Sequence, residues 1–131
     1  MASCHSIDDA QGEKESIAYF KADFPAIDIK DTSSIKGRHV LVRDAVAAYL
    51  VFQVEPAEAA AILRMGFSPS SGKEFADVSG GGNRPPWWLP PAEGMECYKC
   101  DPWRKDMSYS VAVVGYDKAQ GRMYFMHSAF D

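Results

Sequence analysis

The chain has 131 residues, of which 47% are hydrophobic and 24% are charged, and this composition is typical of a single globular domain and excludes wholesale disorder. Its formal net charge of -4 gives no electrostatic basis for binding nucleic acid or an anionic lipid surface, since both require clustered Lys and Arg. No apolar run reaches the roughly 18 residues of a membrane-spanning helix.

The N-terminal residues 1–16 are polar and are expected to form a tether before a single α+β domain at 17–131. Within the tether, Ala2, Ser3 and Cys4 resemble the end of a bacterial lipoprotein signal box, where cleavage leaves a lipid-bearing cysteine. This predicts lipidation of Cys4 and a periplasmic, membrane-anchored location. The alternative is a cytoplasmic protein with an accidental Ala-Ser-Cys.

Two elements are predicted in the first half of the domain. Ile17, Phe20 and Phe24 recur at helical spacing and predict a short amphipathic helix that ends before Pro25. Residues 45–54 alternate between two sets of apolar side chains and predict a strand with at least one face in the core.

A helix and a long connection follow this strand. Glu55-Pro56 opens a run of strong helix formers, because proline suits the first helical turn, and Gly66 is placed to end the helix. From 68 to 91 no regular structure is expected. The glycines at 80–82 lack the Lys and Ser or Thr of a phosphate-binding loop and are interpreted as a hinge.

The segment PPWWLPPAEGMECYKCDPW, residues 85–103, contains all three tryptophans. Trp and Tyr are enriched in binding hot spots, and proline restricts a loop before binding. We therefore predict a platform for a protein partner, formed by Trp87, Trp88, Tyr98 and Trp103. Adjacent residues of an extended segment point in opposite directions, so one of Trp87 and Trp88 is expected in the core and the other on the surface. The alternative is that these tryptophans only fill the core.

Cys97 and Cys100 are predicted to form a disulfide, because they are the even pair left if Cys4 carries lipid. Two unremarkable free thiols are the other interpretation. A structural zinc site would need four ligands, and the sequence has no second Cys-x-x-Cys. A redox pair would need a helix at the motif, which Asp101-Pro102 disfavours.

The C-terminal region, MSYSVAVVGYDKAQGRMYFMHS, reads as two strands joined by a reversal at DKAQG, which predicts an antiparallel hairpin. His127 alternates with Met123 and Phe125 on one face of the second strand. We interpret it as a hydrogen-bonded core histidine in preference to a catalytic base.

The order of DTSSI, AYLVFQVEP, AEAAAILRMGF, PPWW and SVAVVGYDKAQGRMYF resembles a broad set of small bacterial proteins, often exported, over residues 31–128. The resemblance implies a strand, a helix and a hairpin in one domain and favours export, and it carries over no site residues. The expected fold is α+β: an antiparallel sheet of about four strands, with one main helix packed on one face and a long Trp/Pro-rich loop.

The sequence has no Gly-x-Ser-x-Gly nucleophile elbow, no His-Glu-x-x-His zinc-protease motif, no glycine motif of a dinucleotide-binding fold and no phosphate-binding loop. No cofactor is expected. The predicted function is non-enzymatic: an envelope lipoprotein that binds and neutralises a partner protein, such as a toxin or hydrolase, as immunity proteins and inhibitors do. The alternatives are a structural or assembly lipoprotein of the cell envelope, and a cytoplasmic enzyme or ligand-binding protein.

Overall fold

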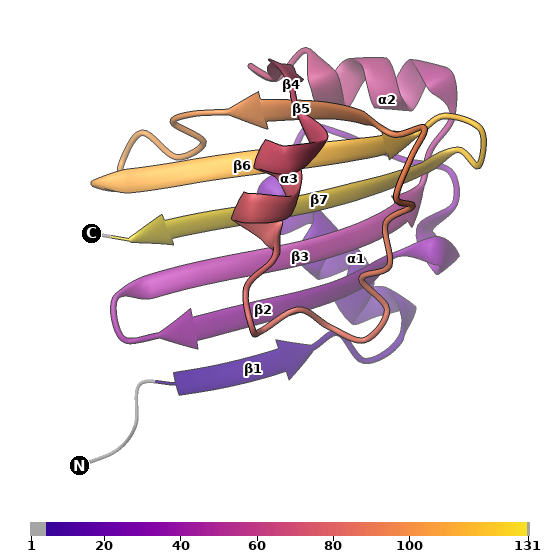
Figure 1. The fold of residues 1–131 in the computed structure, drawn as a ribbon. Helices are drawn as coiled ribbons and strands as arrows, with labels where there is room; N and C mark the ends of the chain where they lie inside the picture. Colours follow the sequence, from indigo (N-terminus) through magenta and orange to yellow (C-terminus); the bar gives the residue numbers. More distant parts are fainter. Residues whose placement is uncertain (1–4, 131) are drawn as a thin grey trace.

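A computed structural model describes residues 5–130, which form a seven-stranded antiparallel sheet with three helices. The strand order is β1-β2-β3-β7-β6-β5-β4 (Figure 1). The elements in chain order are β1 (His5–Asp9), α1 (Gly12–Asp23), the 3-10 helix η1 (Thr32–Ser34), β2 (Lys36–Val42), β3 (Ala45–Gln53), α2 (Pro56–Leu63), β4 (Ser68–Ser70), α3 (Gly72–Ser79), β5 (Glu96–Cys100), β6 (Tyr109–Asp117) and β7 (Arg122–Phe130). The α+β class is confirmed, and the expected sheet of about four strands is too small.

The sheet is covered on both faces, so the expectation of one main helix on one face is wrong. Figure 1 shows α1 and α3 on opposite faces of the central strands. Alternate residues of β3 divide between two cores: Leu50 and Phe52 pack with α1 and α2, and Tyr49 and Val51 pack on the α3 face. We call these the α1 face and the α3 face. A strand buried on both faces is apolar throughout, which explains the continuous run in β3.

Three predicted elements have the expected places. The strand at 45–54 is β3, and the C-terminal hairpin is β6 and β7, paired antiparallel. The helix after Glu55 is α2, and it begins with a capping box. The side chain of Glu55 accepts a hydrogen bond from the backbone N–H of Glu58, and the side chain of Glu58 accepts one from the backbone N–H of Glu55. The predicted N-terminal helix is also present, although it begins earlier, at Gly12.

The expectation of a tether over residues 1–16 is not met in its described part, because His5–Asp9 forms the edge strand β1 and α1 begins at Gly12; residues 1–4 lie outside the described range. Few apolar groups hold this strand, which is why its sequence did not indicate it. Instead, β1 pairs with β2 along its whole length, and Arg38 donates to both carboxylate oxygens of Asp9, from Nε at 2.6 Å and from Nη2 at 2.9 Å.

The connection expected to lack regular structure contains β4 and α3. Ser71 caps α3 by accepting a hydrogen bond from the backbone N–H of Glu74 at 3.0 Å, and the helix buries Phe75 and Ser79 against the sheet. Of the helices in residues 5–130, none combines the length and the apolar character needed to cross a bilayer.

Candidate functional site

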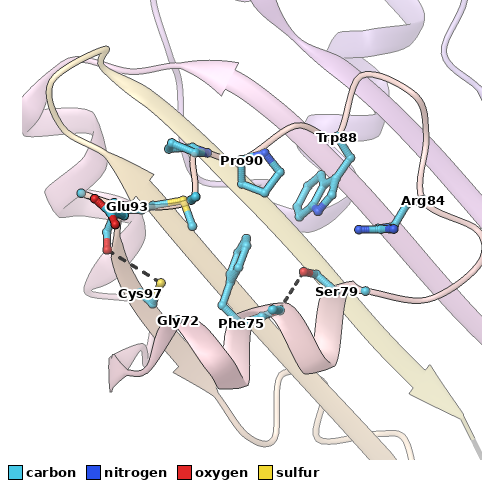
Figure 2. Close-up of a pocket in the computed structure, with 14 residues that line it drawn as sticks. Gly72, Phe75, Ser79, Arg84, Trp88, Pro90, Glu93 and Cys97 are labelled. Carbon is cyan, nitrogen blue, oxygen red and sulfur yellow. Dashed lines mark hydrogen bonds between the residues drawn. The ribbon is translucent and has the colours of Figure 1, made fainter.

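Trp88 is the inward member of the tryptophan pair and anchors the loop that follows α3. Its ring lies 5.2 Å from that of Tyr49, 6.0 Å from that of Phe75 and 5.5 Å from that of Tyr124, measured between centroids. Only 4% of Trp88 is exposed, and Trp87 is half-buried beside it. Figure 2 shows Trp88 directed toward Phe75, between the loop and the helix.

Hydrogen bonds hold the same loop at several points, and we call residues 80–95 the presentation loop. Tyr124 Oη donates to the carbonyl of Leu89 at 3.1 Å, and Arg38 Nη1 donates to the carbonyl of Asn83 at 3.1 Å. The backbone N–H of Trp88 donates to the carbonyl of Pro85 at 3.0 Å. The last of these fixed points is the carbonyl of Leu89, whose side chain projects outward with 73% of the residue exposed.

Two hollows flank the presentation loop. The first, about 340 Å³, lies between the loop and α3, with Arg84 and Glu93 on opposite sides of the Phe75–Trp88 stack (Figure 2). The second, about 360 Å³, has Leu89 and Trp87 on one wall and the sheet residue Tyr124 on another. Lys36 and Arg122 also border this second hollow, which we call the Leu89 hollow, so its rim is basic.

The four aromatic residues predicted to form one platform are not brought together. Trp87 and Trp88 pack on the α3 face, whereas Tyr98 and Trp103 pack on the α1 face. The ring of Trp103 contacts Phe24, Phe67 and Phe125, at centroid distances of 5.3 to 5.9 Å. The segment divides because it runs through β5, the strand between β6 and the edge strand β4, with the two tryptophans before β5 on one face of the sheet and Trp103 after it on the other.

The predicted disulfide is not formed: Cys97 and Cys100 are free thiols on opposite faces of β5. Residues three apart in a strand have Cα atoms about 10 Å apart and side chains that point in opposite directions, whereas a disulfide needs Cα atoms within about 7 Å. Burial raises the pKa of both thiols. Cys4, the predicted lipidation site, lies outside the described residues.

A third cavity opens on the α1 face, toward the edge of the sheet at β1, and we call it the histidine pocket. It has a volume of about 320 Å³. Its floor follows one row of paired residues across the sheet, in which Asp8 pairs with His39, His39 with Ala48, and Ala48 with His127. The C-terminal end of α1 and the loop before β6 complete it. Its charged and histidine side chains are Asp8, Asp23, His39, Arg104 and His127, and Val46 and Ala48 are among its apolar lining residues.

Asp23 and His127 form a buried pair in this pocket. Oδ1 of Asp23 lies 2.9 Å from Nδ1 of His127, and the two side chains are 1% and 4% exposed. Trp103 Nε1 donates to the same Oδ1 at 3.4 Å, and Nη2 of Arg104 lies 3.7 Å from it. Within residues 5–130, Oδ2 of Asp23 and Nδ1 of His127 have no partner of hydrogen-bond geometry, although both are buried. Polar atoms of this kind are rare in native proteins and mark a place that needs explanation.

His39 faces the same cavity from β2. Its ring stacks on that of Tyr19, with centroids 3.9 Å apart. Burial lowers the pKa of His39, an effect that Asp23 opposes and His127 reinforces across the pocket. Among residues 5–130, no three His, Cys, Asp or Glu side chains are grouped so that they could hold a metal ion.

The sequence indicated only part of this pocket. The alternation in β7 correctly placed His127 in the core, although its hydrogen-bonded state is not what the structure shows. Asp23 gave no signal, because the periodicity of α1 marks apolar positions and a buried carboxylate interrupts it. Its contacts come from distant segments, Trp103 being 80 residues away.

Comparisons with known proteins find no match: no family model fits the sequence, and neither the curated proteins nor the solved structures searched contain a significant relative. The fold and its cavities therefore carry the functional argument.

Proposed function

We propose that this protein binds a partner protein through the presentation loop, with Leu89 as the inserted side chain. The observation that carries the proposal is the 73% exposure of Leu89 in a loop whose backbone is held at Leu89 itself and at Asn83. Single exposed leucines are ordinary on protein surfaces. Leu89 differs because half-buried Trp87 and the Leu89 hollow adjoin it, so apolar contact area and a recess occur together.

The fixed loop lowers the cost of binding. Ordering a free backbone residue costs about 1–2 kcal/mol, and a loop already held by Trp88 and the Tyr124 hydrogen bond has largely met that cost during folding. An apolar side chain presented in this way can act as an anchor in a pocket of the partner.

The rim of the Leu89 hollow indicates the chemistry of the partner. Lys36 and Arg122 both border it, so a partner segment that combines an apolar side chain with a carboxylate complements the recess. Envelope location through a lipid on Cys4, and neutralisation of a toxin or hydrolase, belong to the same proposal and are supported by the sequence pattern alone.

Affinity capture with matched variants tests the proposal. Leu89→Asp places a charge at the tip of the loop, and Met65→Asp does the same at another exposed apolar residue, after α2. A partner should be retained by the wild type and by Met65→Asp and lost by Leu89→Asp. With the purified partner, Leu89→Asp should raise Kd by about 30-fold or more, as expected for a hot spot worth about 2 kcal/mol.

Lys36→Glu provides a second arm, because it should weaken the same complex severalfold without touching the loop. Equal affinities for the wild type, Leu89→Asp and Lys36→Glu would contradict the proposal. So would a complex that Met65→Asp disrupts as strongly as Leu89→Asp, since the interface would then lie elsewhere.

A further inference from the structure

The histidine pocket lies on the face of the sheet opposite the presentation loop, and its contents call for a separate explanation. His39 and His127 both face it from strands that are two apart, with Ala48 between them in the paired row. Neighbouring strands lie about 4.8 Å apart, so the two histidine backbones are separated by about 10 Å. Because the intervening side chain is a single methyl group, the space between the rings remains open.

Asp23 fixes the position of the His127 ring. An almost fully buried carboxylate requires a cation close by. Nδ1 of His127 is the nearest basic atom, at 2.9 Å, whereas Arg104 is farther, at 3.7 Å, and 39% exposed. In the geometry of this pair, Nδ1 of His127 is directed at Asp23, and the other ring nitrogen, Nε2, is left for a ligand in the pocket, to which an Nε2–H can donate. The structure records no hydrogen bond from this Nε2 to any residue in 5–130.

The remaining polar groups of the pocket are mainly donors. Arg104 carries five N–H groups, and its guanidinium reaches Asp23 only at 3.7 Å, so most of them are left for another acceptor. His39 offers a ring nitrogen in either protonation state. The opposing groups are the carboxylate of Asp8, which lies in β1 at the open side of the pocket, and Oδ2 of Asp23, which is buried without a partner within residues 5–130.

We propose that the histidine pocket binds a small oxyanion, a carboxylate or a tetrahedral anion, held by Arg104, His39 and the Nε2–H of His127. Asp23 is a positioning residue that holds His127 through Nδ1. Val46 and Ala48 supply an apolar floor for a short carbon chain attached to the anion. Asp8 at the mouth disfavours a highly charged ligand, so a monoanion fits best.

Binding of this kind takes up a proton, and its strength depends on pH. Five charged or titratable groups face the pocket: Asp8 from β1, Asp23 from α1, His39 from β2, Arg104 from its loop and His127 from β7. Among these groups, burial lowers the pKa of His39 from its ordinary value of 6.5, so this ring gains a proton only below that value. The oxyanion should therefore bind more tightly as the pH falls below about 6.5, where His39 gains a proton and a positive charge that faces the anion.

Titration with sodium acetate and sodium sulfate tests the inference, at constant ionic strength maintained with sodium chloride. The readout is the side-chain ¹H–¹⁵N resonances of His39 and His127, which report contact with the anion directly. We expect saturable shifts of both rings with Kd of about 1 mM or below for at least one anion. Acetate alone would identify a carboxylate site, and sulfate alone a site for a tetrahedral anion.

Three variants separate the site from general charge effects. Arg104→Met should weaken binding by about tenfold or more, as expected for loss of a charged hydrogen bond. Val46→Phe, at a half-exposed position on the floor, should abolish binding by filling the pocket while all charged groups remain. Arg84→Met, on the α3 face, is the matched control and should change Kd less than twofold, which is within about 0.4 kcal/mol.

The outcomes that would overturn the inference are specific. The first is that the resonances of neither histidine shift with either anion. The second is that Val46→Phe binds the anion as the wild type does while its backbone spectrum shows a folded protein. Stronger shifts with n-butylammonium chloride than with acetate would also overturn it, because they would identify a cation site governed by Asp8 and Asp23.

Discussion

Replacing Trp88 with alanine is the most informative single perturbation, because this side chain joins the presentation loop to α3 and to two strands. Trp88 is 4% exposed and contacts the rings of Tyr49, Phe75 and Tyr124. Burial of about 200 Å² of indole at about 25 cal/mol per Å² corresponds to about 5 kcal/mol, and Trp-to-Ala substitutions in cores cost about 3–5 kcal/mol. We expect Trp88→Ala to lower the free energy of unfolding by about 4 kcal/mol.

Urea denaturation followed by far-UV circular dichroism measures this change without relying on tryptophan fluorescence. Trp87→Ala is the matched control, since the same type of side chain is removed one residue away from a half-buried position; it should cost about 1–2 kcal/mol. The reasoning is refuted if Trp88→Ala costs no more than Trp87→Ala. A loss confined to hydrogen-exchange protection in 80–95, with global stability unchanged, would also refute it, because the loop would then be a separate unit from the core.

Three further predictions concern other parts of the fold. Asp9→Asn should remove a stabilisation of at most about 0.5 kcal/mol, since Asp9 is 40% exposed, and it leaves the bond from Arg38 to the carbonyl of Asn83 in place. The hydrogen bond from Arg38 lowers the pKa of Asp9, so the difference between wild type and variant should be present at neutral pH and disappear as the pH falls below about 4 in urea titrations. Cys97 and Cys100 should resist iodoacetamide in the folded protein at pH 7, because both are buried and burial raises the pKa of each. Both should be alkylated after unfolding without reductant, and a disulfide-linked peptide in mass spectrometry would contradict this. Gly115→Ala should destabilise the folded protein by about 1–3 kcal/mol, since the new Cβ would lie 2.5 Å from Sδ of Met95. The Met95→Ala background should recover part of the loss in thermal melts, and an unchanged melting temperature in Gly115→Ala would count against this packing.

Local patterns predicted the elements whose own residues carry the signal. The apolar run of β3, the helix formers of α2 and the turn residues between β6 and β7 each determine their structure within a short window. The edge strand β1 did not, because its sequence, HSIDD, is polar and its pairing depends on β2 and on Arg38. Propensity is weak evidence where tertiary partners determine the conformation.

The candidate sites follow the same division. One tryptophan of the pair was expected in the core, and the sequence could not say that it is Trp88, because that depends on which side of the chain meets Tyr49 and Phe75. The disulfide prediction was wrong because the extent of β5 through both cysteines was not recognised, and pairing was inferred from cysteine number. The Asp23–His127 pair requires the position of α1 over β7, which no local pattern contains.

The position of β7 has a consequence for how this chain reaches its native state. β7 inserts between β3 and β6, so the middle of the sheet joins residues 45–53 to residues 122–130. The β2–β3 and β6–β7 hairpins can each form early from neighbouring residues, but their docking closes a long loop, and such non-local pairing slows folding to the millisecond-to-second range. Until that step, β3 and β7 each present a bare hydrogen-bonding edge rich in apolar residues, which favours self-association of the intermediate. The histidine pocket takes Ala48 from one hairpin and His127 from the other, so the ring resonances of His127 report when docking is complete.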